Sequence, residues 1–147
     1  MKLVYRKIGT DDFLECANSL VETFKEEPWN ENWTEKMAFE RIDEIMSARV
    51  SRGYVVCDGE KVVAMLLGRV MTYLEAKELF VDEFSVNPKY QGHGIGSKLL
   101  AFVRDELKKE NIHCMVLNTE KGYPAVKFYE KNDFKQKESI IFMVDIF

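Results

Sequence analysis

The sequence predicts one α/β (α+β) domain that spans residues 1–147. A chain of 147 residues suits a single hydrophobic core. Its hydrophobic fraction of 46% and charged fraction of 31% are those of a globular domain, not of a disordered chain. Apolar residues recur at helical spacing in some segments and in strand-like runs in others, in the order β-α-α-β-β-β-α-β-α-β.

The first part of the chain is expected to be mostly helical. Residues 2–8 can form a strand, and apolar residues at helical spacing then predict a helix that ends before Pro28. A second helix is expected from about residue 34 to residue 48. The loop between the two helices, PWNENW, carries Trp29 and Trp33.

The rest of the chain alternates strands with two further helices. YVVC and KVVAMLLGRVMTY flank Asp58-Gly59, a pair typical of a tight hairpin turn. ELFVDEFSV is expected to form the next strand, and an amphipathic helix follows from Ile95. The remaining expected elements are a buried strand at HCMVLNT, a short helix over residues 124–131 and a closing strand at ESIIFMVDIF.

The charge of the chain is negative and unevenly distributed. The net charge of −4 argues against a nucleic-acid partner. Residues 11–47 hold eleven acids and three bases, a net charge of −8, so the remainder of the chain carries +4. This acidic stretch has two interpretations, the solvated faces of two helices or an attraction for a cationic substrate.

Several classes of site and partner are not expected. The three cysteines, Cys16, Cys57 and Cys114, are odd in number and widely spaced, which indicates reduced thiols and a cytoplasmic protein. With only His93 and His113 besides, no metal site is expected. The sequence offers neither an export signal nor the ~20 apolar residues of a membrane span, so no membrane partner is expected.

Three glycines, Gly92, Gly94 and Gly96, separate the expected strand ELFVDEFSV from the helix that follows. Backbone N–H groups at a helix start form a site for phosphate oxygens, although a glycine loop can also be only a flexible turn. The order Gly-Ser-Lys at residues 96–98 excludes a Walker loop, and the spacing G-x-G-x-G excludes a dinucleotide fingerprint.

Two motifs carry a resemblance to a known family. VNPKYQGHGIG resembles motif A of the GNAT acetyl-CoA-dependent N-acetyltransferases, V-x-P-x-[Y/F]-[R/Q]-G-x-G-[I/L]-G. AVKFYEKNDF resembles the family's A-x-x-F-Y-E-x-x-G-F segment, with Asp133 in place of the glycine, where Asn132 is expected to take the left-handed conformation. The resemblance implies the GNAT fold, a mixed and mostly antiparallel sheet with a splayed strand pair and about four flanking helices.

The same resemblance implies acetyl-CoA or coenzyme A as the co-substrate. Backbone groups of the glycine loop would bind its pyrophosphate, and the preceding strand would pair with its pantetheine arm. The implied coenzyme-binding residues are Phe84, Ser85, Val86, Gln91, Gly92, His93, Gly94, Ile95, Gly96, Ser97, Asn118 and Tyr129.

Transfer to an amine requires a base, and three carboxylates are candidates. An alkylammonium has a pKa near ~10 and must lose a proton before it attacks. Glu78 has the position at which several family members carry their base, and Asp82 and Glu83 follow on the same strand. Adjacent strand residues point to opposite faces, so at most one of Asp82 and Glu83 is expected to face the site. Each of the three has the alternative interpretation of a solvated or salt-bridged carboxylate.

Tyr129 matches the tyrosine of the family's F-Y-E segment, which often protonates the departing coenzyme thiolate. The alternative is a core aromatic. Cys114 is expected to be a core residue on a buried strand, so transfer is expected to be direct, in a ternary complex and without an acyl-enzyme.

The acceptor is expected to be a primary amine, of a cationic small molecule. In the family the first two helices and their loop wall the acceptor pocket, which makes Trp29 and Trp33 candidate substrate-binding residues. A protein N-terminus or lysine is an alternative acceptor. A non-catalytic coenzyme A-binding sensor and a nucleotide-binding regulatory domain are alternatives of other classes. Family members are often dimers, so the resemblance also allows a homodimer.

Overall fold

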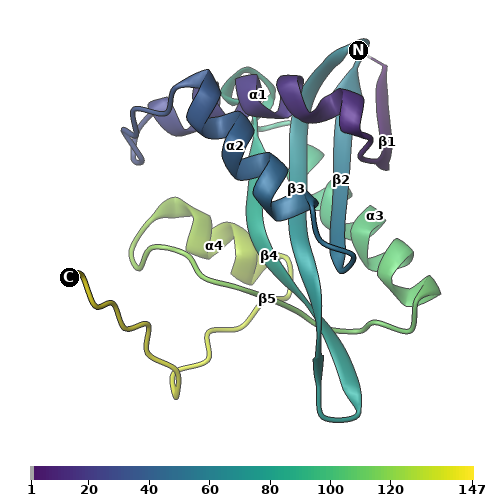
Figure 1. Cartoon of the computed structure of the whole chain (residues 1–147), viewed down its shortest axis with the longest axis vertical. Helices are drawn as coiled ribbons and strands as arrows, with labels where there is room; N and C mark the ends of the chain where they lie inside the picture. The colour runs from purple at the N-terminus through teal and green to yellow at the C-terminus, as the bar shows by residue number, and fades with distance from the viewer. Residues whose placement is uncertain (1) are drawn as a thin grey trace.

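The computed structural model describes residues 2–147 and has nearly every expected element in the expected order (Figure 1). The elements are β1 (Leu3–Lys7), η1 (Thr10–Asp12), α1 (Phe13–Lys25), α2 (Glu35–Met46), β2 (Ser51–Asp58), β3 (Lys61–Tyr73), β4 (Ala76–Val86), η2 (Pro88–Tyr90), α3 (Ile95–Lys109), β5 (Met115–Leu117) and α4 (Pro124–Lys131).

The strands form one mixed sheet in the order β1-β2-β3-β4-β5. Neighbouring strands are antiparallel except for β4 and β5, which are parallel. Alternate residues of the central strands pack on opposite faces. On β3, for example, Leu66 belongs to the core cluster shared with α3, and Leu67 to the cluster shared with α1 and α2. The sheet is therefore covered by helices on both faces, which confirms the predicted α/β architecture.

The strands β4 and β5 separate part-way along β4. They pair from Leu79 opposite Met115 to Val81 opposite Leu117, while β4 itself continues to Val86. Beyond Val81 the β5 side of β4 has no strand partner among the described residues. The expected splayed pair is thus present, and it opens toward the glycine loop that follows β4.

A β-bulge reorients two acidic residues at this opening. The register between β3 and β4 shifts at Leu67 and Gly68, because Glu83 faces Leu67 while Val81 faces Gly68, which leaves Asp82 as the extra residue. A side chain at position 68 would lie 2.2 Å from the carbonyl oxygen of Phe80, so only glycine fits there.

The bulge overturns the expectation that Asp82 and Glu83 point to opposite faces. Val81 and Phe84 both pack in the core cluster on the α3 face, although three positions separate them. Asp82 and Glu83 therefore both lie on the opposite face, toward α1 and α2. Simple alternation fails here because a bulge inserts one residue into the period of two.

The closing strand expected at ESIIFMVDIF is wrong. Residues 140–147 form no helix or strand, and their side chains are exposed. A strand needs a partner for its backbone groups, and this segment pairs with no strand of residues 2–147. The expectation that Asn132 takes the left-handed conformation at the end of α4 is also wrong. Asn132 has a φ of −102°, and Asp133 takes that conformation instead, with a φ of 72°.

Candidate active site

The glycine loop presents free backbone N–H groups at the start of α3. Gly92 and Gly94 have φ values of 82° and 75°, which glycine adopts without steric cost. A Cβ at either position would meet nothing within 4 Å, so open space lies beside both. Among the backbone hydrogen bonds of residues 2–147, none has an N–H of residues 92–97 as its donor, as expected for a loop that enters a helix. These donors and the helix dipole suit a bound anion.

Gly96 has a different purpose from its two neighbours. It is buried, and a Cβ there would lie 2.9 Å from Cζ of Phe128. Its missing side chain therefore lets α3 approach α4, rather than a ligand. Of the other loop residues, Ile95 is a core residue, Ser97 is half-buried and His93 is exposed.

Side-chain hydrogen bonds fix the start of this loop. The amide of Gln91 donates to the carbonyl oxygen of Val86 at 2.9 Å, which ties the loop to the end of β4. Asn87 is fully buried, donates from its side chain to Glu22 of α1 at 2.5 Å and accepts from the N–H of Lys89 at 3.0 Å. The pairing of Asn87 with Glu22 was not predictable from the sequence, because it joins positions 65 residues apart.

The part of β4 without a strand partner carries Phe84, Ser85 and Val86. Phe84 stacks on Phe128 of α4 with ring centroids 5.5 Å apart and meets Tyr129 edge-on at 5.9 Å. The hydroxyl of Ser85 is buried and has no hydrogen-bond partner among the described residues. This unsatisfied hydroxyl, the unpaired strand edge and the free N–H groups of the loop all fit an extended ligand that ends in a phosphate.

Tyr129 lies among aromatic rings at the opening between β4 and α4. Besides Phe84 it contacts Phe128 and Phe134, with ring centroids 5.5 Å and 5.3 Å away. Burial, together with the charge of the Glu83 carboxylate, raises the pKa of Tyr129 to about 12. The hydroxyl is therefore protonated at neutral pH and available as a hydrogen-bond donor.

Glu83 is the buried carboxylate whose charge acts on this tyrosine. Its side chain is only 10% exposed and accepts a hydrogen bond from Nε of Arg41 on α2. Burial raises the pKa of Glu83, the Arg41 guanidinium opposes that rise, and the charges of Glu31 and Asp82 add to it. The result is an ionisable carboxylate with enhanced basicity.

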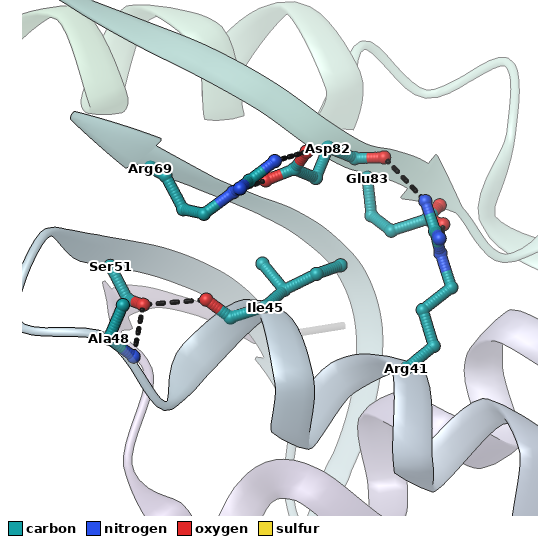
Figure 2. Close-up of polar contacts among 7 residues, drawn as sticks. All are labelled: Arg41, Ile45, Ala48, Ser51, Arg69, Asp82 and Glu83. Atoms are coloured by element: carbon teal, nitrogen blue, oxygen red, sulfur yellow. Dashed lines mark hydrogen bonds and ion pairs between the residues drawn. The ribbon is translucent and has the colours of Figure 1, made fainter. Parts of the chain in front are cut away.

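Asp82 is held away from this position by another arginine. Figure 2 shows Asp82 paired with Arg69 of β3 through two hydrogen bonds of 2.8 Å, while Arg41 reaches Glu83 and the backbone of Asp82. Arg41 is itself positioned by α2, whose end is fixed because the hydroxyl of Ser51 donates to the carbonyl of Ile45 at 2.6 Å. The charge of Asp82 is thus balanced by Arg69 in a bidentate ion pair.

Glu78 lies at the far end of β4 from the opening. Five positions separate it from Glu83, a distance of about 15 Å along a strand. Its carboxylate accepts a weak hydrogen bond from the thiol of Cys114 at 3.5 Å. Of the three candidate carboxylates, only Glu83 has a charge effect on the pKa of Tyr129.

The loop between α1 and α2 reaches the same region. Trp29 meets Phe24 and Tyr123 edge-on, at 5.4 Å and 5.0 Å, so it connects the loop to the start of α4. The guanidinium of Arg41 lies 6.0 Å from the ring of Trp33, which in turn donates to Glu31 at 2.9 Å.

Arg41 and Arg69 are the charged residues of this site that the sequence analysis missed. A signal existed for Arg41, since it is one of only three bases in the acidic stretch of residues 11–47.

Asn118 and Cys114 are exposed at the two ends of β5, so the expectation that Cys114 is a core residue is wrong. Burial and the nearby Glu78 carboxylate raise the pKa of the Cys114 thiol, which disfavours the thiolate that a nucleophile requires.

Two further features of the described chain bear on function. Residues 2–147 contain no cluster of three or more His, Cys, Asp or Glu side chains suited to hold a metal ion. Within the same range, every helix is too short or too polar to cross a membrane.

Comparisons with known proteins identify one family and one fold. The sequence profile of the Acetyltransferase (GNAT) family matches residues 17–134. No curated protein sequence is significantly similar to the chain.

Many solved structures share the fold. A possible acetyltransferase from Clostridium difficile 630 superposes with a TM-score of 0.83 at 18% identity, over 100% of this chain and 99% of that one. A transcriptional regulator from Bacillus halodurans C-125 gives 0.79 at 22% identity, over 98% and 100%. AAC(6')-Iy in complex with the bisubstrate analog CoA-S-monomethyl-acetylneamine gives 0.76 at 13% identity, over 99% of each chain. These likenesses confirm the predicted fold.

Proposed function

Because this chain belongs to the GNAT family of acetyltransferases, we propose that it transfers an acetyl group from acetyl-CoA directly to a primary amine. The observation that carries the proposal is that Tyr129 packs against Phe84, which directly follows Glu83 on β4, where β4 separates from β5. The glycine loop with its free N–H groups follows directly after this opening. The proposed coenzyme site and the two proposed proton-transfer groups therefore adjoin one another.

Acetyl-CoA would supply the activated acetyl thioester, and residues of this chain would hold it. The N–H groups of residues 92–97 fit its pyrophosphate. The edge of Phe84 to Val86 that lacks a strand partner fits the amide-bearing pantetheine arm, which can pair with it as a strand would. Asn118 and Ser97 are expected to contribute only secondary contacts.

Glu83 is proposed as the base that accepts the proton of the incoming ammonium. An alkylammonium has a pKa near ~10, and a carboxylate with a raised pKa is better matched to accept its proton than an ordinary one. Burial in the opening provides that rise, and the Arg41 guanidinium opposes it. Glu78 and Asp82 stay alternatives, with Glu78 remote from Tyr129 and Asp82 bound to Arg69.

Tyr129 is proposed to protonate the coenzyme thiolate as it leaves. The charge of Glu83 contributes to the high pKa of this tyrosine. When Glu83 takes up the proton of the amine, that charge disappears and the pKa of Tyr129 falls. Proton uptake by the base therefore makes the acid stronger at the stage at which the thiolate departs.

The acceptor is proposed to be a cationic small molecule. Glu31, Trp33 and Glu83 offer negative charge and an aromatic face, which suit an ammonium group. An aminoglycoside acetyltransferase from an uncultured soil metagenomic sample, in complex with sisomicin, shares the fold with a TM-score of 0.78 at 14% identity. So does a ribosomal-protein-alanine N-acetyltransferase from Brucella melitensis biovar Abortus 2308, with 0.76 at 12%, so a protein N-terminus remains the alternative.

An assay of thiol release from acetyl-CoA tests the proposal across a panel of acceptors. The panel contains aminoglycosides, polyamines, lysine derivatives, neutral amines and peptides with free N-termini. We expect thiol release with cationic amines and little with neutral ones. Coenzyme binding without thiol release for any acceptor would instead indicate a sensor module. Thermal stabilisation by ATP but not by coenzyme A would indicate a nucleotide-binding domain.

A further inference from the structure

The glycine loop makes few contacts that would fix its own conformation. Gly92 and Gly94 have positive φ values, and open space lies beside both. No backbone N–H of residues 92–97 donates to another backbone group of the described chain. A loop of this kind has many accessible conformations, and a ligand that binds only one of them bears the cost of ordering the loop. The conformation that fits a pyrophosphate therefore depends on the residues that anchor the loop.

The anchors on the β4 side lie in the short turn η2 and directly before it. The N–H of Tyr90 donates to the carbonyl of Asn87 at 2.8 Å, and the N–H of Gln91 donates to the carbonyl of Pro88 at 3.4 Å. The side chain of Gln91 donates to the carbonyl of Val86 at 2.9 Å. A shift of Asn87 would therefore move η2 and, with it, the start of the glycine loop.

Asn87 is the buried centre of these anchors. It is fully buried, and its N–H donates to the carbonyl of Val63 on β3 at 2.8 Å. Its side-chain oxygen accepts from the N–H of Lys89 in η2 at 3.0 Å, and its side-chain amide donates to Oε2 of Glu22 on α1 at 2.5 Å. One side chain thus connects the turn before the glycine loop to a helix that packs on the sheet.

Glu22 holds the other end of this connection. Among the hydrogen bonds of residues 2–147, the one from Asn87 to Glu22 is the one that joins α1 to η2 and its flanking residues. The same carboxylate oxygen lies 3.8 Å from Nζ of Lys61 at the start of β3, so its charge is partly balanced. A hydrogen bond to a carboxylate is stronger than one between two neutral groups, which suits this pair to hold the turn in place.

We propose that Asn87 and Glu22 are positioning residues that set the affinity for acetyl-CoA by holding the glycine loop in its pyrophosphate-binding conformation. The inference rests on the proposed function and adds to it two residues outside the loop. The loop binds the coenzyme equally before and during acetyl transfer, so a displaced loop weakens both states alike. Loss of the pair should therefore raise the KM for acetyl-CoA and leave kcat at saturation nearly unchanged.

The variant Asn87→Asp tests the hydrogen bond directly. It places a carboxylate against that of Glu22 and keeps the oxygen that accepts from Lys89. We expect the KM for acetyl-CoA and the calorimetric Kd of coenzyme A to rise about 10- to 100-fold, as for loss of a hydrogen bond to a charged group. Adding Glu22→Gln supplies a donor opposite the new acceptor, so Asn87→Asp/Glu22→Gln should regain most of the affinity. A double variant that binds as weakly as the single one would overturn the proposal.

Asn18→Asp is the matched control on the same helix. The side-chain amide of Asn18 donates to Glu15 at 3.2 Å within α1, so this variant also brings two carboxylates together, but away from the glycine loop. Its KM for acetyl-CoA should stay within a factor of about two of that of the parent chain. An increase as large as that of Asn87→Asp would assign the effect to α1 as a whole and overturn the proposal.

Glu22→Ala keeps the proposal testable if Asn87→Asp does not fold. The side chain of Glu22 is 46% exposed, so its removal should cost little melting temperature, yet it should raise the KM for acetyl-CoA at least about fivefold. An unchanged KM in this variant, in a parent chain that binds coenzyme A, would overturn this inference alone. A parent chain that does not bind coenzyme A would overturn the proposed function and this inference with it.

Discussion

Arg41 of α2 and Glu83 of β4 form an ion pair at the point where β4 separates from β5. The carboxylate is 10% exposed and the guanidinium 41%, so the pair is buried on one side and open to solvent on the other. A buried carboxylate without a partner would be neutral, and one fully enclosed by cations would be a weak base. At Glu83 burial raises the pKa and the single arginine opposes the rise, and a raised pKa favours removal of a proton from an ammonium.

The variant Glu83→Gln should lower turnover by about 10²- to 10⁴-fold, because the amide cannot accept a proton from the amine. Coenzyme affinity should change little, since the glycine loop is untouched. The measurement is kcat from thiol release together with calorimetric titration of coenzyme A. Glu78→Gln is the matched control at the remote end of β4 and should keep most of its turnover. The assignment fails if Glu78→Gln loses as much activity as Glu83→Gln.

The pH profile of turnover should carry the signature of Glu83. Burial raises its pKa, so the activity should fall with decreasing pH at a value above that of an ordinary glutamate. The raised pKa of Glu83 also makes the free energy of unfolding depend on pH. The folded state holds this proton more tightly than the unfolded chain, so the stability it contributes is full below the unfolded pKa and is lost as the pH rises through the folded pKa.

In the variant Glu83→Gln, the fall of kcat at low pH, which is the acidic limb of the profile, should therefore disappear. Its melting temperature at neutral pH should not decrease. Profiles of kcat from pH 5 to pH 9 for the parent and the variant provide the comparison. An unchanged acidic limb in the variant would assign that limb to another group. Tyr129 should add no basic limb in this range, because its pKa of about 12 lies well above it.

The variant Tyr129→Phe should lower turnover at least about tenfold while coenzyme affinity stays within a factor of about two. The ring that packs against Phe84 and Phe134 is kept, and only the hydroxyl that donates to the thiolate is lost. Tyr73→Phe, on an exposed tyrosine at the end of β3, is the control and should behave as the parent chain does. Turnover and affinity that fall together would indicate a positioning role for Tyr129 instead.

Most of the fold was predictable because local patterns specify it. Helical spacing predicted α1 and α2, and Asp58-Gly59 predicted the β2–β3 hairpin. The glycine spacing also predicted a loop with free backbone donors at the start of α3. In each case the residues that determine the structure lie within a few positions of one another.

The features that could not be predicted depend on distant residues. The bulge that turns Asp82 and Glu83 to one face is accommodated by Gly68, which lies on the neighbouring strand. The partner of Glu83, Arg41, is 42 positions away on a helix. The segment over residues 138–147 has the composition of a strand but pairs with no strand among the described residues, because composition alone does not supply a partner edge.

The variant Gly94→Glu should weaken coenzyme A binding by roughly 10²-fold or more, because a carboxylate would face the pyrophosphate at the start of α3. Gly59→Glu is a matched control, since Gly59 has a φ of 61° against 75° for Gly94 and equally open surroundings, but lies in the β2–β3 turn. Both variants incur the strain of a left-handed side-chain residue, about 1–2 kcal/mol. We expect both variants to lose the same amount of melting temperature and only Gly94→Glu to lose coenzyme binding. This result would show that the loss of binding comes from the site and not from backbone strain. Normal coenzyme binding by Gly94→Glu, measured by calorimetry, would show that the pyrophosphate does not lie on this loop.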